Sequence, residues 1–194
     1  MNILPSIASH FVCAKLVSDK LDVDVEEFYK GNILPDIALL NDSHNKVRGS
    51  FYLIPNIEYF VENSDLNEDI ELGYLCHLLL DKYFLEEFIP ATIPNYREIS
   101  VFSSEMIYED YTSVNYLLIE TFGLDMKFIN KIMFEFPIDI DNKKYEKNLK
   151  CINEGIVNKK LNCLDIDAYM IFLEEVSNII AKELKKFRKV KVKI

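Results

Sequence analysis

Long stretches of this 194-residue chain repeat apolar residues every three or four positions, and only five glycines interrupt them. Apolar residues at this spacing share one face of an α-helix, so the pattern predicts a helical protein. The clearest stretch runs from about Asn67 to Phe88, with Pro90 beyond its expected end. Strand-like alternation is confined to the last six residues, 189–194, and has no predicted partner strand. The predicted fold class is therefore all-α.

We expect helices over residues 6–21, 25–30, 55–63, 67–88, 103–122, 126–135, 141–159 and 165–188. Gly31 and Gly123 are expected to end the second and fifth of these helices, because glycine readily adopts the positive φ found after helix ends. Residues 32–55, with Pro35, Asn41, Gly49 and Pro55 as helix breakers, are expected to be irregular. An irregular stretch of that length inside a domain is uncommon and often functional.

Gly73 lies within the helix expected over 67–88. Glycine there costs about 1 kcal/mol of helix propensity relative to alanine. The position therefore predicts a close approach by another part of the molecule.

The length of the chain predicts a single domain spanning residues 1–194, and its charge predicts that this domain is acidic. The formal net charge is −10. Residues 182–194 carry seven Lys and Arg against one acidic residue, so residues 1–181 hold 15 basic and 31 acidic residues. Such a body repels phosphate backbones, and no nucleic-acid partner is expected. The basic C-terminus could contact an anionic membrane surface, but a solvated helix end that favours the macrodipole is the preferred interpretation.

The expected location is the cytoplasm. The four cysteines, at positions 13, 76, 151 and 163, show no CxxC spacing and no disulfide framework, which is typical of reduced thiols. No apolar run reaches the roughly 20 residues of a membrane span. The N-terminus lacks the basic region of a signal peptide.

The chain has three histidines, His10, His44 and His77, and each lies where its side chain can face inward. Asp81 follows His77 by four residues, so both leave the same helix face, and Asp36 lies between the first two histidines. Neutral imidazole and carboxylate ligate catalytic zinc ions that keep one position open. A single buried histidine is usually a hydrogen-bonded core residue, but three would need three separate hydrogen-bonding solutions. The five residues together therefore predict a metal site.

The order of these motifs resembles the zinc-dependent phospholipase C family, which shares its all-helical fold with the P1-type nucleases. The motifs are Ser-His at 9–10, Gly-Asn-Ile-Leu-Pro-Asp at 31–36, Ser-His at 43–44 and Gly-Tyr-Leu-Cys-His-Leu-Leu-Leu-Asp at 73–81. The resemblance covers roughly residues 5–90. The segment from Ile107 to Asn115 is also similar to small bacterial members, less distinctively.

Carried over position by position, the resemblance implies that His10 binds one zinc ion. It implies that Asp36, His44 and His77 surround another, and that Asp81 bridges the two. Asp36 also matches the carboxylate proposed as the general base in the phospholipases, which makes it the expected catalytic residue.

Two features depart from the family pattern. Family enzymes use the amine and carbonyl of a processed N-terminal Trp as ligands, and this chain has no Trp. They also place a His and then a Glu after the His-x-x-x-Asp motif, whereas residues 82–88 contain no His. Oxygen ligands that could replace the missing ones are Glu86, Glu87, Glu105 and Asp110. We therefore expect one or two ions, with Mn²⁺, Fe²⁺ or Mg²⁺ open beside Zn²⁺.

These features predict a metal-dependent hydrolase of phosphoric esters, a phospholipase C-like phosphodiesterase or a phosphomonoesterase. It would act through a metal-activated water on a small-molecule or lipid phosphate ester. The alternatives are a non-catalytic metalloprotein and a helical interaction domain that retains a degenerate site. Tyr108, Tyr111 and Tyr116 could line a pocket mouth, although core packing is the preferred interpretation. Core packing is also preferred for Cys13 and Cys76.

Overall fold

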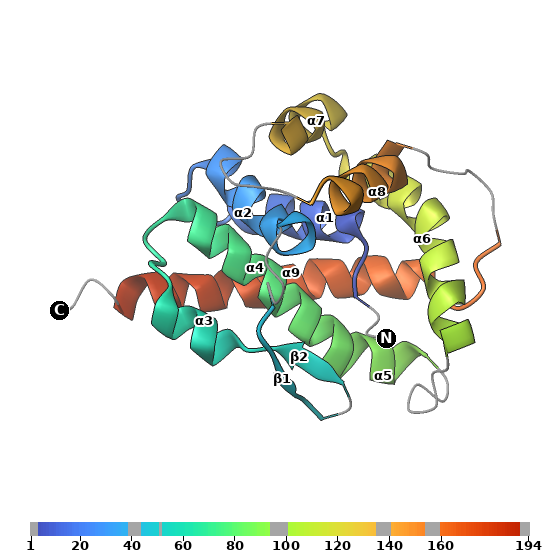
Figure 1. Cartoon of the computed structure of the whole chain (residues 1–194), viewed down its shortest axis with the longest axis horizontal. Coiled ribbons are helices and arrows are strands. Elements are labelled where there is room, and N and C mark those ends of the chain that lie inside the picture. The colour runs from blue at the N-terminus through green and yellow to red at the C-terminus, as the bar shows by residue number, and fades with distance from the viewer. Residues whose placement is uncertain are drawn as a thin grey trace.

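The computed structural model describes residues 4–38, 44–50, 52–93, 101–134, 141–153 and 160–190. These residues form a mostly helical protein with one small antiparallel sheet (Figure 1). The elements in chain order are α1 (Ile7–Ser18), α2 (Val25–Ile37), β1 (Lys46–Arg48), β2 (Leu53–Pro55), α3 (Ile57–Asn63), α4 (Asp69–Tyr83), the π-helical turn η1 (Phe84–Phe88), α5 (Ile89–Thr92), α6 (Val101–Phe122), α7 (Met126–Phe134), α8 (Asn142–Asn153) and α9 (Ile166–Val190).

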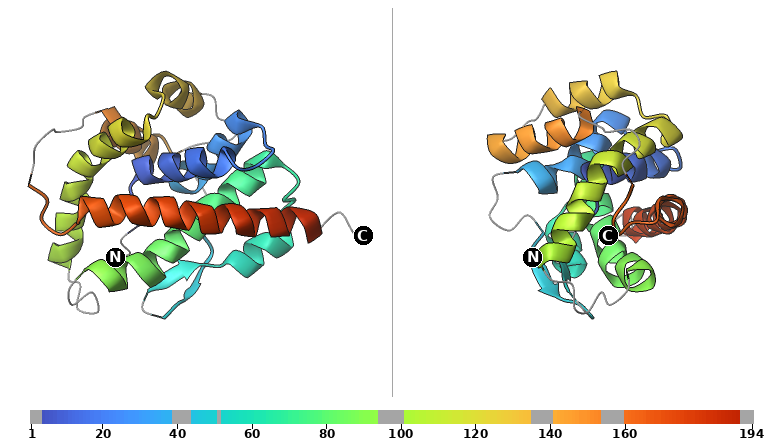
Figure 2. Two further views of the ribbon diagram at one scale, coloured as in Figure 1. Left: turned by 180° about the vertical axis from the view of Figure 1, so that it is seen from behind. Right: turned by 90° about the vertical axis from the view of Figure 1, so that its right-hand side faces the viewer.

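Helix α1 lies at the centre of the described structure and packs against α2, α4, α6, α8 and α9. Most of its side chains are buried, including Phe11, Val12 and Ala14. The long α9 covers α1 and α4 from one side, as the two views of Figure 2 show. Because α1 is enclosed by helices, a polar side chain on it must find its partners within the protein.

Helices α2 and α4 pack with their backbones in contact. A Cβ atom at Gly31 would lie 1.8 Å from the Ile70 carbonyl oxygen, and one at Gly73 would lie 2.0 Å from the Phe28 carbonyl oxygen. No side chain fits at such distances, so the close approach predicted at Gly73 is confirmed. The expectation that Gly31 ends a helix at residue 30 is wrong, because contact with α4 outweighs the low helix propensity of glycine.

The expectation of an irregular stretch over residues 32–55 is wrong for residues 32–37, 46–48 and 53–55. Residues 32–37 continue α2, with Pro35 inside the helix. Strands β1 and β2 pair antiparallel, with Val47 opposite Ile54. Strands of three residues are too short to show an alternating pattern, which is why the sequence did not indicate them. Asn41 lies outside the described residues.

Two proline positions differ from the prediction. Pro55 ends β2, and α3 begins two residues later, capped by the Asn56 side chain, which accepts a hydrogen bond from the Tyr59 N–H at 3.1 Å. The helical path that includes α4 does not stop before Pro90. It continues through η1 into α5, where Pro90 occupies the first turn, a position that proline tolerates.

The remaining helices agree with the prediction to within a few residues over the described ranges. Gly123 follows α6 with a φ of 58°, as expected of a glycine after a helix end. Residues 135, 154–159 and 191–194 of the predicted elements lie outside the described residues. In the described part of the chain, no helix is both long enough and apolar enough to cross a membrane.

The contact between α2 and α4 makes a testable prediction. Gly73→Ala should lower the free energy of unfolding of the metal-free protein by about 2–3 kcal/mol or more, because the new Cβ overlaps the Phe28 carbonyl oxygen. Helix propensity alone would raise stability by about 1 kcal/mol, so the two effects differ in sign. Urea denaturation measures the difference.

Gly123→Ala is the matched control, since a Cβ there has open space and suffers only from the positive φ. Its cost should be about 1–2 kcal/mol. A stabilised Gly73→Ala variant would contradict the packing of α2 against α4.

Candidate metal centre

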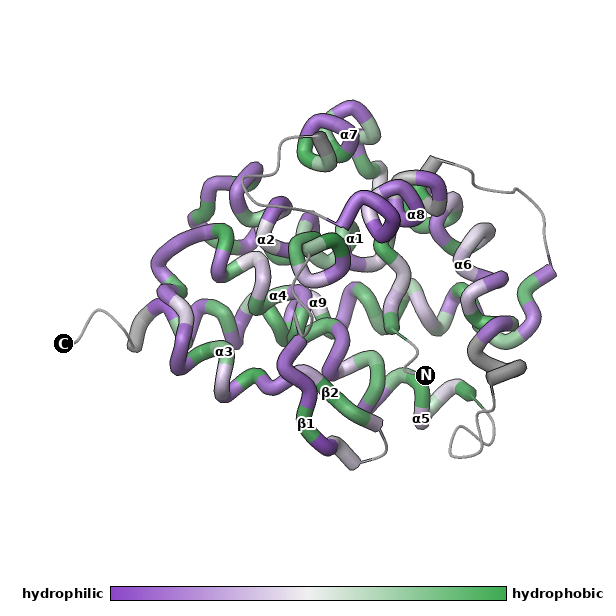
Figure 3. Tube along the Cα trace, viewed as in Figure 1, coloured by the Kyte–Doolittle hydropathy of each residue, from purple (hydrophilic) through white to green (hydrophobic). Residues whose placement is uncertain are grey.

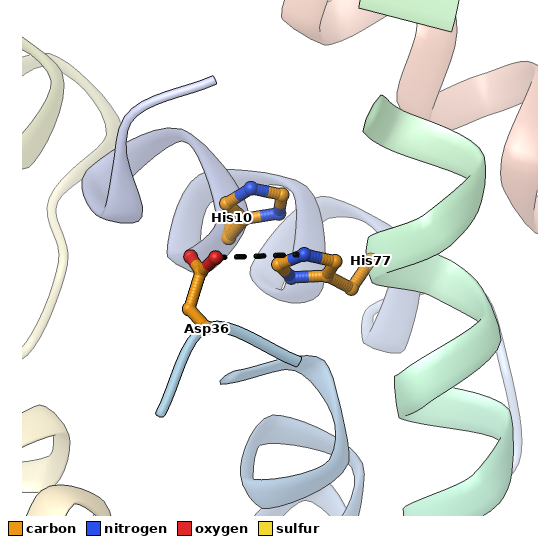
Figure 4. Close-up of side chains that lie close together, drawn as sticks. All are labelled: His10, Asp36 and His77. Carbon is orange, nitrogen blue, oxygen red and sulfur yellow. Dashed lines mark ion pairs between the residues drawn. The ribbon is translucent and has the colours of Figure 1, made fainter. Parts of the chain in front are cut away.

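The structure brings the five predicted ligands together from separate parts of the chain. His10 comes from α1, Asp36 from α2 and His44 from the residues before β1, while His77 and Asp81 come from α4. Figure 4 shows His10, Asp36 and His77 converging from their three helices. The side chains of His10, His77 and Asp81 are at most 1% exposed.

Three of these residues form a triangle of ligand atoms. The His44 Nε2 atom lies 3.1 Å from Asp81 Oδ2 and 3.2 Å from His77 Nε2. The third side, from His77 Nε2 to Asp81 Oδ2, is 3.5 Å. Around a tetrahedral zinc ion with bonds of about 2.0–2.2 Å, two ligand atoms lie about 3.3–3.6 Å apart. The triangle therefore has nearly the dimensions of one face of a zinc coordination shell.

A second group consists of His10, Asp36 and His77. The imidazole rings of His10 and His77 stack with centroids 3.8 Å apart and planes 8° apart. Asp36 Oδ1 lies 3.9 Å from His77 Nε2, the contact marked in Figure 4. His10 Nε2 also approaches Asp81 Oδ1, at 3.4 Å. Both groups are thus connected through His77.

His77 is oriented by a hydrogen bond from Nδ1 to the Asn32 carbonyl oxygen, at 2.8 Å. Because a carbonyl oxygen only accepts, Nδ1 carries the proton in the neutral ring and Nε2 keeps its single lone pair. Metal-ligating histidines typically show this arrangement. One lone pair serves one ion, so the two groups that share His77 cannot both use it at the same time.

The grouping differs from the one that the family resemblance implies. His10 joins Asp36 and His77, and Asp81 joins His44 and His77. Asp81 lies within 3.1–3.5 Å of all three histidines, which makes it the most central of the five residues.

Asn32 is not among the ligands predicted from the sequence, yet it supports two of them. In the orientation that satisfies both neighbours, its side-chain nitrogen donates to the His10 carbonyl oxygen at 2.8 Å, and its side-chain oxygen accepts from the His77 backbone N–H at 3.2 Å. The backbone carbonyl oxygen of Asn32 accepts the hydrogen bond from His77 Nδ1. The sequence feature that could have indicated this role is the position of Asn32 within the Gly-Asn-Ile-Leu-Pro-Asp motif.

The centre carries a buried negative charge. Neither Asp81 oxygen accepts a hydrogen bond from the residues that the structure describes, and neither His10 ring nitrogen has a hydrogen-bond partner among them. Burial alone would raise the pKa of Asp81, but His77, His44 and His10 outweigh it and lower this pKa far below its usual range. A buried carboxylate without hydrogen bonds is costly unless a positive charge lies beside it.

The pKa values of the two stacked histidines shift in opposite directions. Burial, together with the nearby His77, lowers the pKa of His10 well below its usual value, so this ring stays neutral. Burial also acts to lower the pKa of His77, but the carboxylates of Asp81 and Asp36 outweigh it and raise this pKa. The two carboxylates thus favour a proton on the His77 ring, next to the buried charge of Asp81.

Asp36 links the centre to solvent. It is 22% exposed, the largest exposed fraction of the five side chains, and it lines a cleft of about 270 Å³. Burial raises the pKa of its carboxyl group, and the Asp81 charge acts in the same direction. A carboxyl group with a raised pKa at a cleft wall suits proton exchange with a bound molecule.

The four proposed replacement ligands stand apart from both groups in the described part of the chain. Glu87 and Glu105 are exposed to solvent. Asp110 is fully buried, and both of its oxygens accept hydrogen bonds from the segment before α9: the Asn162 N–H and side-chain amide (2.8 and 3.0 Å), the Cys163 N–H (2.8 Å) and the Leu164 N–H (3.0 Å). Asp110 therefore secures the chain ahead of α9.

The other residues noted in the sequence divide between cleft and core. Tyr108 and Tyr111 line the cleft beside Asp36. Tyr111 is also almost completely buried and donates a hydrogen bond to the Leu4 carbonyl oxygen at 2.6 Å. Cys13 and Cys76 are buried thiols with sulfur atoms 3.7 Å apart, in agreement with core packing.

Comparisons with protein-family models, with curated proteins and with solved structures find no match to this chain. The geometry itself defines a class: a mostly helical protein in which three histidines and two aspartates gather into a buried cluster able to hold a metal ion.

The hydrogen bonds to Asp110 make a prediction that separates a structural role from ligation. Asp110→Asn should lower the free energy of unfolding by about 2–3 kcal/mol, because an amide nitrogen would face backbone N–H donors. Metal content measured by elemental mass spectrometry should stay unchanged. Glu120→Gln, at an exposed position of the same helix, is the control. Loss of metal from a stably folded Asp110→Asn protein would instead assign Asp110 to the centre.

Proposed function

We propose that the protein is a metal-dependent hydrolase of phosphoric esters, similar in chemistry to the zinc-dependent phospholipases C. The observation that carries the proposal is the triangle formed by His44, His77 and Asp81, which has sides of 3.1, 3.2 and 3.5 Å and lies beside a cleft-lining carboxylate. Three protein ligands with a free fourth position are the arrangement of catalytic zinc sites. The order of the motifs along the chain supports a phospholipase C or P1 nuclease-like fold.

Charge and hydrogen bonding support a metal ion in the cluster. Asp81 is fully buried and needs a positive charge next to it. A divalent cation would supply that charge and would also occupy the lone pairs of the histidines. The hydrogen bond from His77 Nδ1 to the Asn32 carbonyl oxygen leaves the Nε2 atom, 3.2 Å from His44 Nε2, to bind the ion.

The lone pair of His77 limits the number of ions. One ion fits the triangle, and a second would have to use His10, Asp36 or Asp81 without His77. Imidazole ligands favour Zn²⁺ or Fe²⁺ over Mn²⁺ and Mg²⁺, which prefer oxygen. Zinc agrees best with the short sides of the triangle.

The remaining chemistry follows from the placement of Asp36. When bound, the cation supplies Lewis acidity, which lowers the pKa of a water and offsets charge on a phosphate oxygen. Among the five site residues, Asp36 is the one that lines the cleft, so a molecule bound there can reach its carboxylate. The raised pKa of Asp36 suits this carboxylate to accept the proton of the attacking water. His10 and His77 are completely buried, so their rings shield the centre from bulk water.

A non-catalytic metalloprotein is the second candidate. Asp36 Oδ1 lies 3.9 Å from His77 Nε2, close enough for a small movement to make it a fourth ligand and close the shell. A closed four-ligand shell is typical of structural zinc. Turnover distinguishes the two candidates.

The proposal includes a cytoplasmic location. The free thiols of Cys13, Cys76 and Cys163 support it, because thiols persist in reducing compartments.

Zinc binding should depend on pH through His77. The ion must displace a proton from His77, and the raised pKa of His77 means that this proton competes with the ion at a higher pH than it would on an ordinary histidine. Affinity should therefore be constant above that pKa and decline below it, by about tenfold per pH unit for one proton. Competition with a chromophoric chelator between about pH 5.5 and 8.5 measures the decline. Equal zinc binding by His77→Gln and wild type would contradict the assignment.

Asp36→Asn tests the catalytic role. The variant should retain zinc, because the triangle is intact, while its turnover of bis(p-nitrophenyl) phosphate or another phosphate ester should fall about 100-fold or more. Glu120→Gln controls for the loss of one carboxylate at an exposed site. If zinc-loaded wild type turns over no member of a broad phosphate-ester panel and Asp36→Asn loses zinc, the non-catalytic alternative is correct.

A further inference from the structure

The cleft beside Asp36 has cationic side chains on the wall formed by α8. The start of α1 and residues of α6 form the other walls, and the cavity measures about 270 Å³. Lys144 and Lys147 of α8 line it together with Tyr108. Among the described residues that line this cleft, Asp36 is the one acidic side chain.

Helix α8 is basic in an otherwise acidic protein. It carries four lysines (143, 144, 147 and 150) against Glu146, whereas the whole chain has a net charge of −10. Figure 3 shows the hydrophilic character of this helix. Cations concentrated at one cleft of an acidic molecule create a local potential that attracts anions.

Both lysines of the cleft are held by neighbouring groups. The Lys144 ammonium donates a hydrogen bond to the Ala38 carbonyl oxygen, just after α2, at 3.4 Å. The Lys147 ammonium lies 5.8 Å from the centre of the Tyr108 ring. Two positive charges thus lie on the wall of the cleft that Asp36 also lines.

We propose that Lys144 and Lys147 bind a second anionic group of the substrate, so that the protein prefers small phosphate esters with a phosphate or carboxylate besides the ester that is cleaved. The inference rests on the proposed function, which assigns the first phosphate to the metal centre. A metal ion at the centre would offset the charge of Asp36 and would leave the two ammonium groups available to an anion. Lysine is a common phosphate ligand that acts as a point charge.

The size of the cleft favours a small substrate. Its volume lies near the lower end of the range for small-molecule pockets. The tyrosine rings contribute apolar surface for a short carbon chain between the two anionic groups. The cleft, at about 270 Å³, is too small to enclose a long acyl chain.

Direct binding tests the inference without relying on turnover. Three non-hydrolysable probes carry the same four-carbon alkyl chain: butylphosphonate, butane-1,4-bisphosphonate and 5-phosphonopentanoate. Isothermal titration calorimetry of the full chain, with and without stoichiometric zinc, should show that a second anionic group strengthens binding about tenfold or more. The bisphosphonate and the carboxylate probe together show which second group is preferred. Added salt should weaken the preference.

A pair of double variants locates the effect. Lys144→Gln/Lys147→Gln should abolish the preference, whereas Lys143→Gln/Lys150→Gln removes the same two charges from α8 outside the cleft lining and should retain it. Equal binding of all three probes by wild type, or the same loss in both double variants, would overturn the inference.

The outcomes separate this inference from the proposed hydrolase. If the lysine-dependent preference is present but no phosphate ester is cleaved, the cleft assignment stands and the hydrolase proposal fails. If esters are cleaved but no preference depends on Lys144 and Lys147, the cleft assignment fails and the hydrolase proposal stands.

Discussion

At the crossing of α2 and α4, two glycines allow the helix backbones to touch, and the geometry of the metal cluster follows from that contact. Gly31 and Gly73 each face a carbonyl oxygen of the opposite helix. With the helices this close, the Asn32 carbonyl oxygen lies 2.8 Å from the Nδ1 atom of His77. Asp36, one turn further along α2, lies near the other ring nitrogen, with its Oδ1 atom 3.9 Å from Nε2. A larger residue at either crossing point would move α2 away and separate these contacts.

Burial of Asp81 links stability to metal binding. The carboxylate lies among three imidazoles in the interior and has no hydrogen bond from the residues described. A proton on His77 or a divalent ion can balance it, and the two compete for the same lone pair. Asp36 differs from the other four side chains because it also reaches the cleft. One cluster thereby combines a rigid, buried ligand set with a single accessible carboxylate.

Several features could be predicted from the sequence because they depend on residue type and local spacing. The helical periodicity, the end of α6 at Gly123 and the inward face shared by His77 and Asp81 are of this kind. The five site residues were found because histidines are few and carboxylates accompany them in an ordered set of motifs. The close approach at Gly73 was indicated by the cost of glycine inside a helix.

What the sequence by itself determined is the helical class, the set of residues that meet in the cluster and the acidity of the molecule. Tertiary structure alone decided that α2 continues through Gly31, that residues 46–48 and 53–55 pair as strands, and that Asn32 supports His10 and His77. It also brought Lys144 and Lys147 to the cleft beside Asp36, about 110 positions away in the chain. The physical reason is that these features depend on contacts between distant segments, which outweigh the local preferences that a sequence displays.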